Sequence, residues 1–153
     1  KSCFKKNTED YLGYDEYYVL NQILDILPDD YVVLIKKHPE ENKQKYYEKS
    51  YSNCMVMNDL SFAQMIKIPD IIIGMGSFLL IELAMKRDDV VSFKPKSLKP
   101  YFGDEIKATI KIDNKNELFK YITTENQKLK TKTFRYRFNG SHDKIFRIIS
   151  SML

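Results

Sequence analysis

Short apolar runs alternate along the chain with segments in which apolar residues recur at helical spacing. Four of these runs are rich in Val, Ile and Phe, and their length and composition are typical of buried strands. The expected strands cover residues 31–36, 54–58, 70–74 and 90–94. Each run is bounded by polar residues, Pro or Gly, so the strands are expected to be short.

Helical periodicity fills the intervals between these runs. The expected helices cover residues 15–27, 60–68, 77–87, 115–122 and 141–153. Tyr17 and Leu20 begin the apolar face of the first helix, and Pro28 ends it. Asp59 is the expected cap of the second helix, and Pro69 follows its end. Strands and helices in this order predict an α/β fold: a Rossmann-like parallel sheet of at least four strands, with right-handed crossovers and helices on both faces.

Composition supports one globular domain. Of the 153 residues, 43% are hydrophobic and 30% are charged, which is too apolar for a disordered chain. No apolar run approaches the ~18 residues of a membrane span, and no signal-peptide pattern opens the chain. Cys3 and Cys54 have neither metal-type spacing nor the density of a disulfide framework. We therefore expect a single domain over residues 1–153, in the cytoplasm, without a metal site.

The charge is divided unevenly. Residues 1–93 hold 11 basic and 15 acidic residues, net −4, whereas residues 94–153 hold 14 basic and 6 acidic residues, net +8. The densest basic segment is "KLKTKTFRYR", residues 128–137. This excess indicates either a solvated basic face or attraction to phosphates, which includes peripheral contact with the inner face of the cell membrane. No nucleic-acid-binding motif accompanies it, so a nucleic-acid partner is not expected.

Two strand ends carry the candidate site residues. A parallel sheet binds its ligands at the carboxyl ends of its strands. In "LIKKHPEE", Pro39 favours an extended His38, which would hold the imidazole at the tip of the strand. In "IIIGMGSFLLIE", a strand turns through Gly74 and Gly76 into a helix that begins beside Ser77. Backbone N–H groups at such a turn are suited to a phosphate.

Glu82 is an acid within an otherwise apolar helical segment. A carboxylate in such a segment needs a hydrogen-bonding partner. Two partners fit its place about one and a half turns after Ser77: the hydroxyl groups of a ribose, or a buried arginine or lysine.

These residues resemble a known family. "IKKHPEE" followed by "PDIIIGMGSFLLIELAM" is similar to the C-terminal, donor-binding half of GT-B glycosyltransferases. The likeness is closest to bacterial surface-polysaccharide enzymes with His-Pro and Ser motifs, namely sialyltransferases, capsule Kdo transferases and CDP-glycerol polymerases. The resemblance implies that His38, with Pro39, and Ser77, with Gly74 and Gly76, bind the phosphate of a CMP- or CDP-linked donor. It implies that Glu82 binds the ribose.

The resemblance also implies what lies outside the chain. The catalytic base and the site for a glycan or lipid-linked acceptor usually belong to the N-terminal half of GT-B enzymes, so the chain, which opens at Lys1, is expected to be part of a two-domain protein. No catalytic residue is assigned within it, and the only small molecule expected is the nucleotide sugar. Two alternatives remain: a UDP-sugar epimerase-like domain, and a non-catalytic Rossmann module that serves binding or assembly.

Overall fold

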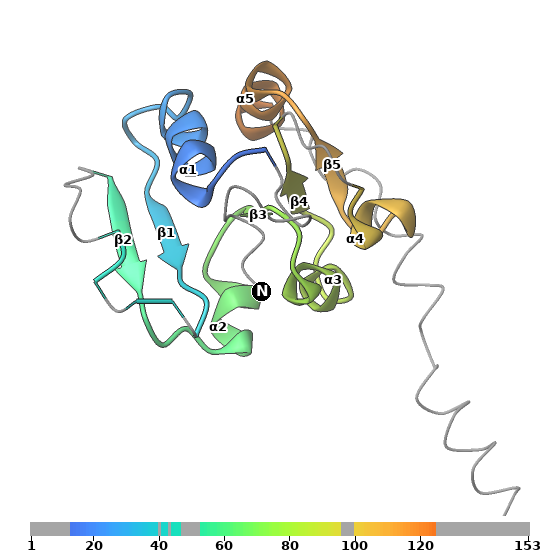
Figure 1. Cartoon of the computed structure of the whole chain (residues 1–153), viewed down its shortest axis with the longest axis horizontal. Coiled ribbons are helices and arrows are strands. Elements are labelled where there is room, and N and C mark those ends of the chain that lie inside the picture. The colour runs from blue at the N-terminus through green and yellow to red at the C-terminus, as the bar shows by residue number, and fades with distance from the viewer. Residues whose placement is uncertain (1–12, 40, 43, 47–52, 96–99, 125–153) are drawn as a thin grey trace, which may run out of the picture.

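The chain folds into a mixed α/β structure with short parallel strands (Figure 1). The computed structural model describes residues 13–39, 41–42, 44–46, 53–95 and 100–124. Its strands are β1 (Val33–Lys36), β2 (Cys54–Met57), β3 (Ile72–Gly74), β4 (Val90–Phe93) and β5 (Ile110–Ile112). Its helices are α1 (Glu16–Leu24), α2 (Phe62–Lys67), α3 (Phe78–Ala84), α4 (Phe102–Glu105) and α5 (Lys115–Thr123).

The strands form two parallel sheets. In the first, β1 pairs with β2 so that Val33 lies opposite Cys54. In the second, β4 lies between β3 and β5, with Gly74 opposite Ser92. The sequence predicted one sheet containing all four expected strands, and this detail is not reproduced, because in the described residues no ladder joins β1 to β3. Periodicity identifies a strand, whereas the pairing of its edges depends on contacts with distant segments.

Only one of the expected strands is fully buried. All four residues of β4 are inaccessible, whereas β1, β2 and β3 are partly exposed. Met55, in β2, is 56% exposed, and Val32, directly before β1, is 63% exposed. The central position of β4 explains the difference, because this strand has a neighbour on each side and a helical layer on each face.

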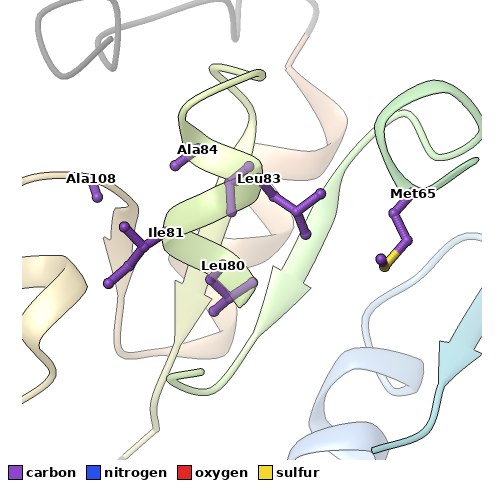
Figure 2. Packing of buried hydrophobic residues seen from close by; sticks show 7 residues of the cluster. Met65, Leu80, Ile81, Leu83, Ala84 and Ala108 are labelled. Atoms are coloured by element: carbon purple, nitrogen blue, oxygen red, sulfur yellow. The ribbon is translucent and has the colours of Figure 1, made fainter. Parts of the chain in front are cut away.

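Helices cover both faces of the three-stranded sheet, as the sequence predicted. Side chains of β4 alternate between the faces: Val90 packs in a cluster with α2 and α3, and Val91 and Phe93 pack in a cluster with α1 and α5. Figure 2 shows Leu80 and Leu83 of α3 in the first of these clusters. The sheet that carries the candidate turn is thus held between two apolar layers.

Four of the five expected helices are present, and one expected cap was wrong. Ser61, not Asp59, caps α2, because its side chain and that of Gln64 form a reciprocal capping box. The helix expected over residues 141–153 lies outside the described residues. The sequence interpretation missed α4 and β5, which have only four and three residues.

Arg87 ties the end of α3 to the segment that enters β3. Its guanidinium donates hydrogen bonds to the carbonyl oxygens of Ile66 (2.8 Å), Pro69 (2.5 Å) and Asp70 (2.8 Å), and it also binds the carboxylate of Asp89. Because Asp89 directly precedes β4, this network fixes the amino-terminal side of the sheet.

Candidate functional site

The candidate site is built on the turn of residues 74–77, which joins β3 to α3. Two of its four positions are glycines, and a different feature disfavours a side chain at each. A Cβ atom on Gly74 would lie 2.9 Å from both terminal carbons of Leu80, a buried core residue. Gly76 has a φ of +146°, a conformation that side chains strongly disfavour. The backbone conformation therefore favours glycine at position 76, whereas a larger residue at position 74 would have to displace the side chain of Leu80.

Ser77 is the N-cap residue of α3, in the extended conformation expected there. Its side chain makes no capping hydrogen bond, although serine often caps helices in this way. The residue is exposed. The hydroxyl group is therefore not used to stabilise the helix, and it is accessible to a ligand at the turn.

Tyr101 covers the turn from the direction of α4. A Cβ atom on Gly76 would lie 3.2 Å from the Tyr101 ring, and the phenol donates a hydrogen bond to the carbonyl oxygen of Ser77 at 2.7 Å. Burial, and then the negative charge of Asp104, raise the pKa of Tyr101 to about 12. The phenol therefore stays protonated at neutral pH and remains a donor to the turn.

A buried polar cluster supports Tyr101 at the end of β4. The carboxylate of Asp104 accepts hydrogen bonds from Ser92 and from Thr109 (2.9 Å). The ammonium group of Lys94, whose side chain is 4% exposed, lies 3.3 Å from the other oxygen of Asp104. It also lies 5.4 Å from the centroid of the Tyr101 ring, within cation–π distance.

The sequence interpretation missed this cluster. Its signal was "VVSFK", in which a lysine directly follows a strand that is otherwise buried. The strand register places Lys94 near the turn. Gly74, the last residue of β3, pairs with Ser92, and Lys94 follows Ser92 by two residues. Its backbone N–H donates to Ile112 (3.1 Å), which continues the ladder between β4 and β5 by one residue.

His38 and Pro39 follow β1, as the sequence predicted, and both are exposed. The backbone N–H of His38 donates to the carboxylate of Glu41 at 3.0 Å, and the N–H of Glu41 donates back to the carbonyl oxygen of His38 at 3.0 Å. These reciprocal bonds close a tight turn and set the direction in which the chain leaves β1.

Lys45 anchors this turn to α1. Its ammonium group binds the carboxylates of Glu16 and Glu41 and lies over the rings of Tyr17 and Tyr46. Burial alone would lower the pKa of Lys45, but its hydrogen bonds to Glu16 and Glu41 outweigh burial and raise that pKa. The lysine therefore remains charged, and the loop after β1 is held against the start of α1.

Glu82 is exposed, although its neighbours in the sequence are apolar. The buried residues of α3 are Leu80, Ile81, Leu83 and Ala84. Helical rotation turns Glu82 away from this buried face, so the carboxylate needs no protein partner. The alternative partner, a buried arginine or lysine, is not found among the described residues, and a role in binding ribose stays a prediction.

Other site chemistry is limited in the part of the chain that the structure describes. In that part, no three His, Cys, Asp or Glu side chains gather closely enough to hold a metal ion, and no helix is long and apolar enough to cross a membrane. Cys54 carries a free thiol whose pKa is raised by burial. Cys3 and the basic segment 128–137 lie outside the described residues.

Comparisons of the chain with protein-family models, curated proteins and solved structures gave no match.

Proposed function

We propose that this chain binds the nucleotide-sugar donor of a glycosyltransferase that makes a bacterial surface polysaccharide, with a CMP- or CDP-linked donor favoured. The observation that carries the proposal is the turn of residues 74–77. The backbone at Gly76 has a conformation that side chains disfavour, and Ser77 presents an uncommitted hydroxyl where a parallel strand passes into a helix. Phosphate groups bind at turns of this kind.

The proposal includes a single Rossmann-like arrangement in which β1 lies next to β3. Tyr31, just before β1, donates a hydrogen bond to Ile122 in the last turn of α5 (3.4 Å). Burial, and then the charge of Asp89, raise the pKa of the adjacent Tyr121 to about 12. Asp89 directly precedes β4, so these two contacts favour an arrangement in which the amino ends of β1 and β4 lie on one side of the molecule. In the proposed arrangement their carboxyl ends, and with them His38, lie on the opposite side.

Each candidate residue has a role in this proposal. Ser77 and the backbone of the turn hold the donor phosphates, His38 contacts the same phosphates or the cytidine, and Glu82 accepts hydrogen bonds from the ribose. The chemistry of such a site is positioning of the donor and stabilisation of the phosphate leaving group. The catalytic base and the glycan or lipid-linked acceptor are assigned to another domain.

Isothermal titration calorimetry with CMP, CDP and UDP tests the proposal. We expect the cytidine nucleotides to bind more tightly than UDP. Preference for UDP would instead support the epimerase-like alternative, and absence of binding to all three would support a non-catalytic module.

Ser77→Ala separates binding at the turn from binding elsewhere. Because the hydroxyl makes no capping bond, the variant should fold normally, whereas loss of a hydrogen bond to a charged phosphate should weaken CMP binding by about ten-fold. Thr123→Ala, which removes an exposed hydroxyl from the end of α5, is the matched control. Equal affinities in both variants would place the nucleotide away from the turn.

The same proposal includes a location of the protein on the cytoplasmic side, with basic residues of the C-terminal third near the membrane. Cell fractionation tests this location.

A further inference from the structure

One face of the two-stranded sheet is open to solvent among the described residues. Leu34 of β1 pairs with Met55 of β2, so their side chains lie on the same face. The period of two places Val32 and Met57 on this face as well, with Lys36 at its carboxyl end. Val32 is 63% exposed and Met55 is 56% exposed. We call the surface formed by Val32, Leu34, Met55 and Met57 the open face.

The composition of the two strands indicates that both of their faces are covered. β2 reads Cys-Met-Val-Met and β1 begins Val-Leu-Ile, and parallel strands with such continuous apolar runs are buried on both sides. Neither of the apolar clusters that the described residues form includes a side chain of β1 or β2. The two strands lie at one edge of the molecule (Figure 1). The cover that their sequence predicts must therefore come from outside the described residues.

Residues 141–153, which are expected to be helical and lie outside the described residues, have a pattern that fits this face. Four of their apolar side chains follow the spacing i, i+3, i+4 and i+7, namely Ile145, Ile148, Ile149 and Met152. In a helix these side chains form one apolar stripe, with charged and serine residues on the other side. The stability of such a helix comes mainly from packing of its stripe against another apolar surface.

The chain leaves α5 close to the open face. The carbonyl oxygen of Ile122, in the last turn of α5, accepts a hydrogen bond from Tyr31 at 3.4 Å, and Tyr31 directly precedes Val32. The 16 residues 125–140 then connect α5 to the expected helix. When extended they span roughly 50 Å, several times the roughly 10 Å thickness of a sheet or helix layer. The connection is therefore long enough to carry the helix around the amino end of β1 to the open face.

The charges along this route are complementary. Asp29 and Asp30 are exposed shortly before β1. The side chain of Asn53, directly before β2, donates a hydrogen bond to the carbonyl oxygen of Asp29 at 3.2 Å, which fixes this acidic loop at the amino end of both strands. The connecting residues include the basic segment 128–137, which has five lysines and arginines and no acid. Attraction between these charges favours passage of the segment along this end of the sheet.

We propose that residues 141–153 form a helix that packs its apolar stripe on the open face, so that the chain covers its own two-stranded sheet. This inference does not depend on the proposed function. Residues 1–12 are less well placed, because they lead into α1, whose first residue, Glu16, binds Lys45 beyond the carboxyl end of β1. A second copy of the chain or a separate protein would have no such connection to the amino end of β1.

Methionine oxidation by hydrogen peroxide tests the cover in the intact chain. The oxidation rate of each methionine, followed by mass spectrometry of peptides, is compared with its rate in the urea-unfolded chain. Met65, which is 8% exposed, and Met85, which is 41% exposed, are the internal standards. If the segment covers the open face, Met55 should be protected as strongly as Met65 and several-fold more than Met85. Protection of Met55 no greater than that of Met85 would overturn the inference.

Ile149→Asp identifies the occupant. A carboxylate within the apolar stripe should release the segment, so the oxidation rate of Met55 should rise at least to that of Met85. Ser150→Asp is the matched control, because it adds the same charge on the polar side of the expected helix, and Met55 should stay protected. Unchanged rates at Met65 and Met85 show that the remaining fold is intact. If these two rates also rise, Ile149→Ala replaces Ile149→Asp with the same expected result.

Two further outcomes would assign the cover to another occupant and refute the inference. One is protection of Met55 that persists in Ile149→Asp. The other is protection that is lost on dilution together with a change in sedimentation, which would identify a second copy of the chain. None of these results concerns nucleotide binding at the turn of residues 74–77, so the proposed function stands or fails separately.

Discussion

Arg87→Lys tests the account of how the sheet is held to its helices. The guanidinium reaches four separate groups, namely the carbonyl oxygen of Ile66 in α2, those of Pro69 and Asp70 before β3, and the carboxylate of Asp89. A lysine has one nitrogen, which cannot occupy the positions of Nε, Nη1 and Nη2 together. We expect at least two of the four groups to lose their charged donor.

The magnitude follows from the number of bonds lost. A hydrogen bond to a charged group contributes about 1.5–3 kcal/mol, and water will replace part of the loss near the exposed Asp70, so the free energy of unfolding should fall by about 2–4 kcal/mol. For a chain of 153 residues this lowers the melting temperature by roughly 5–12 °C.

Thermal and urea unfolding, followed by circular dichroism, measure this change. The control is Lys86→Gln, which alters the adjacent, exposed residue and should change stability by less than about 0.5 kcal/mol. If Arg87→Lys falls within the same limit as the control, the network around Arg87 does not stabilise the fold as described.

Three further predictions concern Glu82, the turn of residues 74–77 and the phenols of Tyr101 and Tyr121. Glu82→Gln should leave the free energy of unfolding within about 0.5 kcal/mol of wild type, because Glu82 is exposed. Calorimetry should show CMP affinity weakened by about 1.5–3 kcal/mol. A destabilised variant with normal affinity would refute the ribose role. Gly76→Ala should cost about 1–3 kcal/mol in urea unfolding because of its φ of +146°, and an unchanged midpoint would contradict this backbone conformation. Burial raises the pKa values of Tyr101 and Tyr121 from 10.0 to about 12, so the folded state favours the neutral phenols. The contribution of these phenols to the free energy of unfolding should be complete below pH 10 and should fall toward pH 12. A double substitution to Phe should reduce that fall, and an identical pH profile would show that these phenols titrate normally.

The sequence was most informative where a structural demand falls on one residue or on a local pattern. Gly74 and Gly76 were marked by type alone; the backbone conformation favours glycine at position 76, and the side chain of Leu80 packs against position 74. Helical spacing also placed Leu20 on the apolar face of α1, where it is buried, because burial on one face imposes that spacing directly. In these elements the physical constraint acts within a few residues of the chain.

Features that depend on distant contacts could not be predicted in this way. Tyr101 lies 24 residues from Ser77, its hydrogen-bond acceptor, and nothing in its local sequence indicates that bond. Lys94 and Asp104 form their buried pair only after β4 and α4 have packed together. Glu82 illustrates a different error: its apolar neighbours suggested that the carboxylate needs a hydrogen-bonding partner, although helical rotation places it on the exposed face.

Amide chemical shifts, measured by two-dimensional NMR during titration with CMP, test the central claim most directly. If the turn of residues 74–77 holds the phosphate and the carboxyl ends of β1 and β3 lie together, the largest changes should occur at Gly76, Ser77 and His38, with a smaller change at Glu82. Changes confined to the basic segment 128–137, or changes at Ser77 without any at His38, would contradict the account.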